Sequence, residues 1–231
     1  MKKILFIIPF LLILASCTET KKIDVNPPTP TSQIEKQVSS TEEKPVMSST
    51  PMSKDTKMLP TPFYGSGKNL IEIFADFQCP ACQNFTKNFE PVLKEFADKG
   101  MIRIEYRQFP LDMHKNAIRD ALSALCSAEQ GKYMEGKSAI YDLEISKKQA
   151  PVSDAERVEA LVKAGIDRVE LEKCLETDRY LDQVDNDVQL GESRRVNGTP
   201  TVFLDGKRID NAFFRDPDTF KMNLERILSP Q

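Results

Sequence analysis

The chain has 231 residues, of which 32 are Lys or Arg and 35 are Asp or Glu, so its formal net charge is -3 at pH 7. A small negative charge gives no electrostatic basis for binding a polyanion, and we expect no nucleic-acid partner. The sequence contains one histidine and five cysteines. The spacing of the cysteines therefore carries most of the chemical information.

Residues 1–16 have the form of a bacterial export signal. Lys2 and Lys3 precede an apolar run over residues 4–15, which is shorter than the roughly 20 residues of a membrane-spanning helix. The run closes with Leu14-Ala15-Ser16-Cys17, which resembles the bacterial lipobox. That resemblance implies cleavage before Cys17, lipidation of Cys17 and attachment to a membrane through the lipid. The alternative is an ordinary signal peptide with a stray cysteine behind it.

Residues 17–62 are rich in Pro, Ser, Thr, Lys and Glu and show almost no apolar periodicity. Such a composition cannot bury a core. It predicts a disordered tether, and the lipobox resemblance implies that this tether is lipidated at Cys17 and joins the membrane to the rest of the chain.

The segment Leu70–Phe74 is short, apolar and rich in β-branched and aromatic residues, which predicts a strand. Cys79-Pro80-Ala81-Cys82 follows, and the apolar residues beyond it recur at helical spacing, so we expect a helix that begins at Pro80 and is kinked at Pro91.

A sulfur at a helix start meets unpaired backbone N–H groups and the positive end of the helix dipole, so we expect a lowered pKa for Cys79. Cys82 follows one turn later and is placed to resolve a mixed disulfide formed at Cys79. The motif predicts a two-electron redox pair.

A C-x-x-C motif is also half of many zinc sites. Zinc would need two more ligands, but the chain has no second C-x-x-C and only one histidine. We therefore expect no metal and no other cofactor.

The residues after the C-x-x-C helix predict one more strand and then helices. Residues 101–107 alternate like a half-buried strand. From about Asp112 the apolar period becomes helical, with helix ends expected at Gly131, Gly165 and Gly191. Ser153-Asp154-Ala155-Glu156 has the form of a capping box.

The last part of the chain predicts a hairpin and a helix. Residues 201–204, a turn at Asp205-Gly206 and a second strand at Arg208-Ile209 form the hairpin. A final helix is expected from about Asp216.

Two motifs in this order resemble the DsbA-like branch of the thioredoxin superfamily: residues 74–82, which contain the C-x-x-C, and residues 197–206, which contain Thr199-Pro200. The resemblance covers about Phe63 to the C-terminus. It implies an α/β thioredoxin fold with an inserted all-helical domain. We assign residues 63–112 and 193–231 to the thioredoxin-like domain and residues 113–192 to the insertion, and we expect a monomer.

The resemblance also implies thiol–disulfide exchange on unfolded or partly folded exported proteins, with Cys79 and Cys82 as catalytic residues. It implies a cis bond before Pro200 and backbone hydrogen bonds from Thr199 to an extended client. The expected location is the cell envelope, on the extracytoplasmic side. We favour disulfide formation, with re-oxidation by a quinone-linked membrane oxidase. The alternatives are a reductase or isomerase with an electron-supplying membrane partner, and a non-enzymatic client-binding module.

Two positions depart from the family pattern. Ala81 stands where strong oxidants of the family have a histidine, so one donor to the thiolate is missing. Ile73 stands where many members have a buried acid, and Glu72 is expected on the other face of its strand. Proton transfer to or from Cys82 must therefore use water or another group.

Four further residues have expected roles. The remaining cysteines, Cys126 and Cys174, are an even pair in an oxidising compartment, so we expect a structural disulfide between them. The alternative is two buried free thiols. We expect a structural or exposed role for His114, and for Asp76 a turn or capping role in preference to tuning of the redox site.

Overall fold

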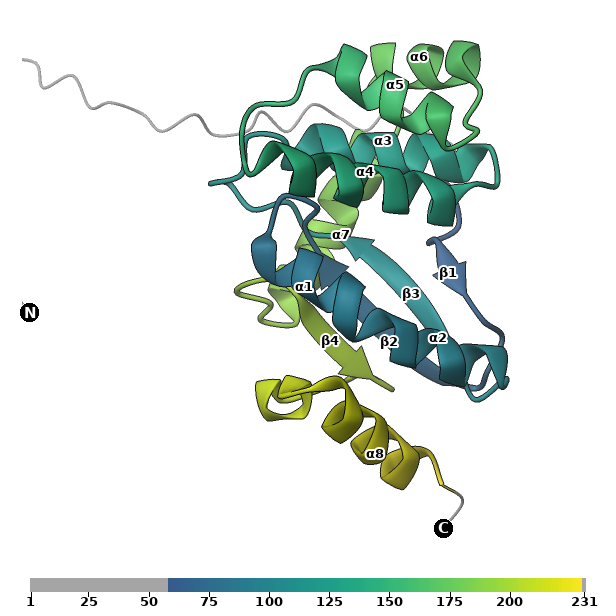
Figure 1. Cartoon of the computed structure of the whole chain (residues 1–231), viewed down its shortest axis with the longest axis vertical. Coiled ribbons are helices and arrows are strands. Elements are labelled where there is room, and N and C mark those ends of the chain that lie inside the picture. The colour runs from purple at the N-terminus through teal and green to yellow at the C-terminus, as the bar shows by residue number, and fades with distance from the viewer. Residues whose placement is uncertain (1–57, 230–231) are drawn as a thin grey trace, which may run out of the picture. The chain divides into compact units, whose positions relative to one another are not determined.

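The structure is a computed structural model that describes residues 58–229 (Figure 1). The expected signal peptide, the lipidation site at Cys17 and residues 17–57 of the expected tether lie outside the described residues.

A five-stranded mixed sheet has the strand order β1-β3-β2-β4-β5. Its strands are β1 (Phe63–Tyr64), β2 (Asn69–Ala75), β3 (Ile102–Gln108), β4 (Thr201–Leu204) and β5 (Lys207–Arg208). The central pair, β2 and β3, is parallel, and the other three pairs are antiparallel. Because β2 is central, both of its faces are covered: Ile73 packs in the larger core and Phe74 in a second core on the opposite face.

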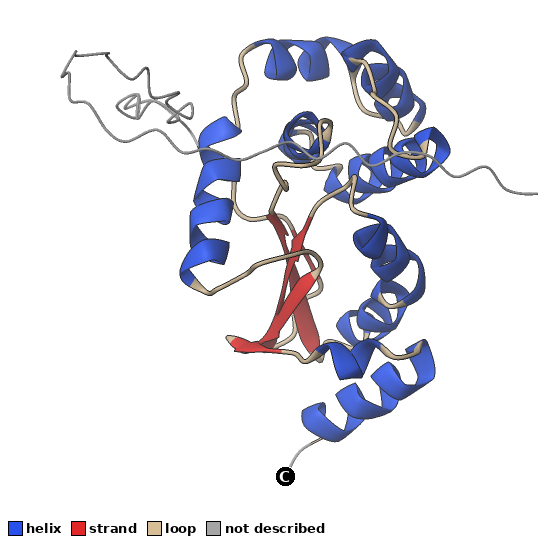
Figure 2. Ribbon diagram, turned by 90° about the vertical axis from the view of Figure 1, so that its left-hand side faces the viewer, coloured by secondary structure: helices blue, strands red, loops and turns tan. Residues whose placement is uncertain are grey.

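Helices cover both faces of this sheet. Figure 2 shows helices on both sides of the sheet. The helices are α1 (Pro80–Asn88), α2 (Glu90–Asp98), α3 (Ala117–Glu129), α4 (Tyr133–Lys147), α5 (Asp154–Lys163), α6 (Arg168–Glu176), α7 (Leu181–Ser193) and α8 (Pro217–Leu228), with a 3-10 turn at Asn211–Phe214. The α/β class and the helical insertion expected from the sequence are confirmed, because α3 to α6 follow β3 without an intervening strand.

The kink expected at Pro91 is a break between two helices, and it lies at Phe89. Phe89 ends α1 and precedes α2, and Pro91 lies in the first turn of α2. A proline is tolerated there because the first N–H groups of a helix have no intrahelical partner.

The insertion is held together by a covalent bond and a capped helix. Cys126 on α3 and Cys174 on α6 form a disulfide, with Cα atoms 5.9 Å apart. The capping box is also present, since Ser153 Oγ accepts from the backbone N–H of Glu156 and the Glu156 carboxylate accepts from that of Ser153.

The position of α7 corrects two expectations. The apolar pattern predicts this helix within the insertion and its end before Gly191, but α7 packs on the sheet and continues to Ser193. The glycine is needed for this packing, because a Cβ atom at Gly191 would lie 2.5 Å from the ring of Phe109. Asp187 accepts a hydrogen bond of 2.9 Å from the backbone N–H of Gln108 in β3. The sheet face opposite α1 is therefore covered by α7.

Residues 58–62 correct a third expectation, because their composition predicts that they belong to the disordered tether. The carbonyl of Pro62 accepts a hydrogen bond of 2.9 Å from the N–H of Tyr106, and Thr61 Oγ1 accepts one of 2.9 Å from Arg107. The backbone N–H of Leu59 donates to Gln183 at 3.1 Å. The ordered chain therefore begins before residue 63, because this segment pairs with β3 and α7.

Candidate active site

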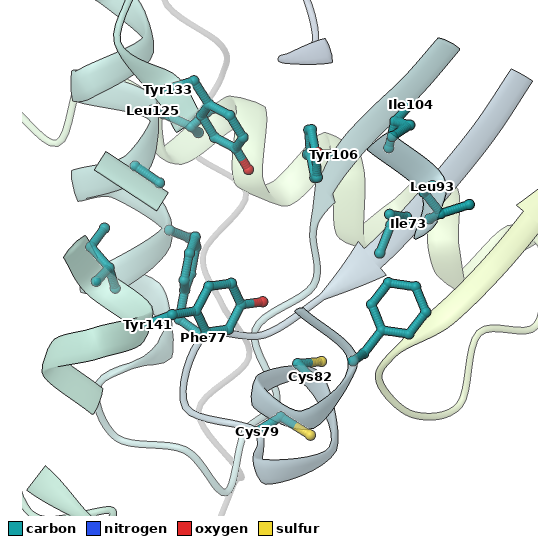
Figure 3. Close-up of a cluster of buried hydrophobic side chains, with 14 of the residues drawn as sticks. Ile73, Phe77, Cys79, Cys82, Leu93, Ile104, Tyr106, Leu125, Tyr133 and Tyr141 are labelled. Carbon is teal, nitrogen blue, oxygen red and sulfur yellow. The ribbon is translucent and has the colours of Figure 1, made fainter. Parts of the chain in front are cut away.

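The two cysteines of the C-x-x-C motif lie where β2 gives way to α1. Cys79 is the N-cap residue of α1, Pro80 occupies the first helical turn, and Cys82 is buried inside that turn. Both thiols are free, and Figure 3 shows them below the end of β2. Cys79 is 7% exposed and Cys82 is 1% exposed. Cys79 is therefore the more exposed of the two residues.

The segment before β4 lies against Cys79. The sulfur of Cys79 lies 3.4 Å from the carbonyl oxygen of Thr199, to which the protonated thiol donates a hydrogen bond, and the peptide bond between Thr199 and Pro200 is cis. Pro200 also lines the space around Cys82. The fold thus brings together the two motifs on which the family resemblance depends.

The pKa of Cys79 is lowered to about 5. The main cause is a hydrogen bond from the Cys82 thiol, and partial burial opposes it. The side chain of Thr199 and the backbone N–H groups of Ala81 and Cys82 lower the pKa further. The direction expected from the helix start is therefore correct, but the neighbouring thiol contributes more than the backbone N–H groups.

The pKa of Cys82 is shifted in the opposite direction, to well above the value of an ordinary thiol. Burial is the main cause, and the hydrogen bond to Cys79 and the negative charge of the Cys79 thiolate add to it. The backbone N–H of Asp76 lies 3.5 Å from the Cys82 sulfur and partly offsets these effects. Near neutral pH, Cys79 is thus a thiolate and Cys82 is a protonated thiol.

Asp76 and His114 hold the loop between β2 and α1 in place. Asp76 Oδ1 accepts from the N–H of Gln78 at 2.8 Å, and Oδ2 accepts from the N–H of Leu111 at 2.8 Å and lies 2.7 Å from His114 Nδ1. The expected turn role of Asp76 and structural role of His114 are both confirmed. Through these bonds the two side chains also fix the backbone N–H that faces Cys82.

Ile73 lies beside Cys82, so the family's usual buried acid is absent from this position. Ile73 is buried and lines the same small cavity as Cys82. Glu72 lies on the opposite face of β2, as expected, and forms ion pairs with Arg107 and Arg194. Neither residue offers a proton acceptor to Cys82.

Sequence reasoning missed four side chains on the inner side of Cys82. Glu90 from α2, Tyr106 from β3, and Lys137 and Tyr141 from α4 line the cavity with it. No sequence signal marked Glu90 and Lys137, because charged residues in helical patterns normally indicate a solvated face.

The described residues contain neither a candidate metal site nor a membrane-spanning helix. In residues 58–229, no group of three His, Cys, Asp or Glu side chains could hold a metal ion. No helix in the same part of the chain is long and apolar enough to cross a membrane.

Comparison with known proteins gives the family. The model of a family described as Thioredoxin matches residues 60–226, which is most of the chain. The protein therefore belongs to this thioredoxin family.

Individual relatives are more distant. The chain is 28% identical over 165 residues to Disulfide bond formation protein D of Bacillus subtilis (strain 168), covering 67% of this chain and 70% of that protein. It is also 28% identical over 140 residues to the Na(+)/H(+) antiporter NhaA 1 of Mycolicibacterium vanbaalenii, but it spans only 22% of the antiporter's length. Among solved structures, oxidised BdbD from Bacillus subtilis superposes with a TM-score of 0.63 at 22% identity, covering 73% of this chain and 92% of that one. This last likeness concerns the fold.

Proposed function

We propose that this protein is a thiol–disulfide oxidoreductase of exported proteins, in which Cys79 exchanges with the client and Cys82 resolves the mixed disulfide. One observation carries the proposal: adjacent cysteines have opposite pKa shifts, and the more accessible one has the pKa lowered to about 5. A low pKa keeps Cys79 in the thiolate form, which is the form that attacks and leaves in disulfide exchange. Membership of the thioredoxin family and the relative named Disulfide bond formation protein D support it.

Disulfide formation is the direction that we favour. A client thiolate attacks the Cys79 sulfur of the oxidised pair, the Cys79–Cys82 bond breaks, and Cys82 leaves with the electron pair and takes up a proton. A second client thiolate then attacks the client sulfur of the mixed disulfide, and Cys79 leaves. The client loses two electrons and the pair gains them. The low pKa of Cys79 makes it a good leaving group in the last step.

The client-binding surface in this proposal is the backbone around Thr199 and Pro200. The carbonyl of Thr199 lies 3.4 Å from the Cys79 sulfur, so a client strand paired here would place its own sulfur beside Cys79. Pairing through backbone atoms suits clients of many sequences.

The proposal for the whole chain includes its location and partners. Residues 1–16 are the export signal, Cys17 carries the lipid, and the segment from residue 17 to the ordered chain is a tether on the extracytoplasmic side. Residues 113–192 form the insertion between the two parts of the thioredoxin-like domain, except that α7 belongs with the sheet. Re-oxidation would come from a quinone-linked membrane oxidase. A reductase or isomerase would instead draw electrons from a membrane reductase.

Equilibration of the full chain with glutathione buffers tests the direction. Thioredoxin and the strongest oxidants differ by about 150 mV, and about 30 mV corresponds to a tenfold change in the equilibrium constant. We expect a potential between these limits, because Cys79 is strongly acidic but Ala81 supplies no side-chain donor. A potential at or below that of thioredoxin would overturn the oxidant assignment.

A Cys79→Ser variant tests the class of function. The variant should lose activity in cells, whereas a Cys126→Ala/Cys174→Ala control should keep it. Retained function with Cys79→Ser would support the non-enzymatic client-binding module.

A further inference from the structure

A buried ion pair lies behind the active site. Lys137 Nζ lies 2.5 Å from Glu90 Oε2, and the two residues are 4% and 2% exposed. Glu90 also accepts a hydrogen bond of 2.9 Å from the hydroxyl of Tyr106. The ammonium group of Lys137 lies 5.2 Å from the centre of the Tyr141 ring. The pair joins α2, beside the C-x-x-C, to α4 of the insertion.

The same side chains line a cavity with the Cys82 sulfur. The cavity has a volume of about 10 Å³, close to the lower limit for one water molecule. Figure 3 shows Tyr106, Tyr141 and Ile73 on the inner side of Cys82, away from Cys79. Cys82 and the ion pair therefore face the same enclosed space.

Cys82 must exchange a proton in either direction of catalysis, but its surroundings offer few partners. Its side chain is buried, Ile73 is apolar, and Asp76 presents a backbone N–H rather than an acceptor. A buried ion pair is costly to desolvate, and replacing one by apolar residues is often neutral or stabilising. Its presence beside Cys82 is therefore poorly explained by stability alone.

We propose that Lys137, held in the cavity by Glu90, is the positioning and proton-exchange residue for Cys82. The inference rests on the proposed thiol–disulfide exchange. When the Cys79–Cys82 bond breaks, Cys82 takes the electron pair and a proton passes from Lys137 Nζ to the Cys82 sulfur across the cavity that both residues line. The neutral amine stays beside the Glu90 carboxylate and regains a proton from solvent before the next turnover. In the reverse direction, the charge of Lys137 stabilises the Cys82 thiolate as it forms.

The pKa shifts agree with this geometry. Burial lowers the pKa of Lys137 and raises that of Cys82, so the two groups are shifted toward each other. Burial opposes ionisation of Glu90, but the charge of Lys137 and its hydrogen bond more than offset this, and the pKa of Glu90 is lowered. The other titratable groups that face the pair or Cys82 are Cys79 on α1, Lys94 on α2, Tyr106 on β3, and Tyr133 and Tyr141 on α4.

The test separates the two chemical steps. The reduced full-length protein is mixed with oxidised glutathione, whereupon the Cys79 thiolate forms a mixed disulfide and releases one glutathione. Cys82 then attacks the Cys79 sulfur and releases the second glutathione. Formation of the mixed disulfide tests the proposed function, and the rate of the second release tests the role of Lys137.

Substituting Lys137 and substituting Glu90 should change the rate of the second glutathione release in opposite directions. Lys137→Met leaves a negative charge beside Cys82, so the second release should slow at least about tenfold at pH 7 and recover at higher pH. Glu90→Gln leaves a positive charge there, so the second release should be faster and its pH dependence should move to lower pH. The first step should change less than about twofold in both. A purely structural ion pair would lose stability in both variants without these opposite pH shifts, and that result would overturn the inference.

Two further variants distinguish a specific effect on the second release from misfolding. The double variant Glu90→Gln/Lys137→Met leaves no unpaired buried charge, so it should unfold near the wild-type temperature. Its second release should still be slower than that of the wild type. Lys147→Met removes another ion-paired lysine of α4, the partner of Glu156, and should leave both steps unchanged. A wild-type rate and pH dependence in the double variant would end the proposal, whereas failure of the first step in the wild-type protein would refute the proposed function instead.

Discussion

The sulfur of Cys79 lies 3.4 Å from the carbonyl oxygen of Thr199, a residue 120 positions further along the chain. Sheet pairing makes this contact possible, because β2 and β4 are antiparallel neighbours with Phe74 opposite Thr201. The residues after β2 and those before β4 therefore meet at one end of the sheet. The C-x-x-C motif and the Thr199-Pro200 dipeptide form one site for this reason.

The first prediction concerns alkylation of the reduced protein. Because the pKa of Cys79 is lowered to about 5, this thiol should react with iodoacetamide at half its maximal rate near pH 5, whereas a free thiol requires a pH near 8.5. Cys82 should stay nearly unreactive, since it is buried and its pKa is raised. Peptide mapping after brief alkylation at several pH values measures both. Earlier labelling of Cys82 would reverse the assigned roles.

The second prediction follows from the same pKa through its linkage to folding. The pKa of Cys79 is lower in the folded than in the unfolded chain, so its thiolate contributes stability that is complete above the unfolded pKa of about 8.5 and is lost as the pH falls through about 5. Cys82 stays protonated in the folded chain over this range, and it opposes the gain only near pH 8.5, where the unfolded Cys82 thiol begins to ionise. The Cys79→Ser variant keeps Cys82, so the comparison of the two proteins isolates Cys79. Compared with a Cys79→Ser variant, the reduced protein should gain stability as the pH rises from 5 to 8.5. Urea unfolding at several pH values measures the difference, and parallel curves for the two proteins would contradict it.

The third prediction concerns the hydroxyl group of Thr199. The hydroxyl is buried and has no hydrogen-bond partner in the structure, so it is available to donate to the Cys79 thiolate. This interaction lowers the pKa of Cys79, so Thr199→Val should raise that pKa. A hydrogen bond contributes about 1 kcal/mol and one pKa unit corresponds to about 1.4 kcal/mol, so the rise should be at most about one unit. Thiolate absorbance during a pH titration measures it. Thr201→Val is the matched control, because the hydroxyl of Thr201 donates to the carbonyl of Gly198 and should leave the pKa of Cys79 unchanged.

The fourth prediction concerns the disulfide between Cys126 and Cys174, which closes a loop of 48 residues. In the chain-entropy model, a loop of this length stabilises by roughly 4 kcal/mol. Cys126→Ala/Cys174→Ala should therefore lower the free energy of unfolding by up to that amount while thiol–disulfide exchange at Cys79 continues. Thiol counting on the oxidised protein under denaturing conditions should find none of the four cysteines 79, 82, 126 and 174 free. Two free thiols would contradict the bonded state.

Much of the fold could be predicted from local patterns. The apolar run of β2 and the alternation in β3 each depend on residues close in the sequence, and so does the capping box at Ser153. The redox pair was visible for the same reason, because its four residues are consecutive. What could not be predicted depends on packing between distant segments.

Two examples show this limit. Gly191 has the local character of a helix end, and only the approach of α7 to Phe109 shows why it lies inside a helix. Glu90 and Lys137 are 47 positions apart, and each alone indicates a solvated helix face. Their burial follows from the packing of the insertion against the C-x-x-C helices, which no single segment encodes.

The fifth prediction tests the packing of α7 on the sheet. A Cβ atom at Gly191 would lie 2.5 Å from one ring atom of Phe109 and 3.1 Å from one of Phe74, and both rings are buried in the second core. Alanine normally favours a helix over glycine by about 1 kcal/mol. If no side chain lay close to Gly191 in the helix, Gly191→Ala would therefore stabilise the protein. Because the rings must move, we expect a net loss of roughly 1–3 kcal/mol, as for other overpacked cores.

Urea unfolding of two separate variants, Gly191→Ala and the control Gly198→Ala, tests this expected loss of stability. Gly198 lies in the loop before β4, and an added Cβ atom there would meet no atom within 4 Å. Its substitution should change the free energy of unfolding by less than about 0.5 kcal/mol. Gly191→Ala should lower it with an unchanged dependence on urea concentration, because the fold is kept and only the contact between α7 and the sheet is strained. A more stable Gly191→Ala protein would show that α7 lies further from Phe109 and Phe74 than the structure places it.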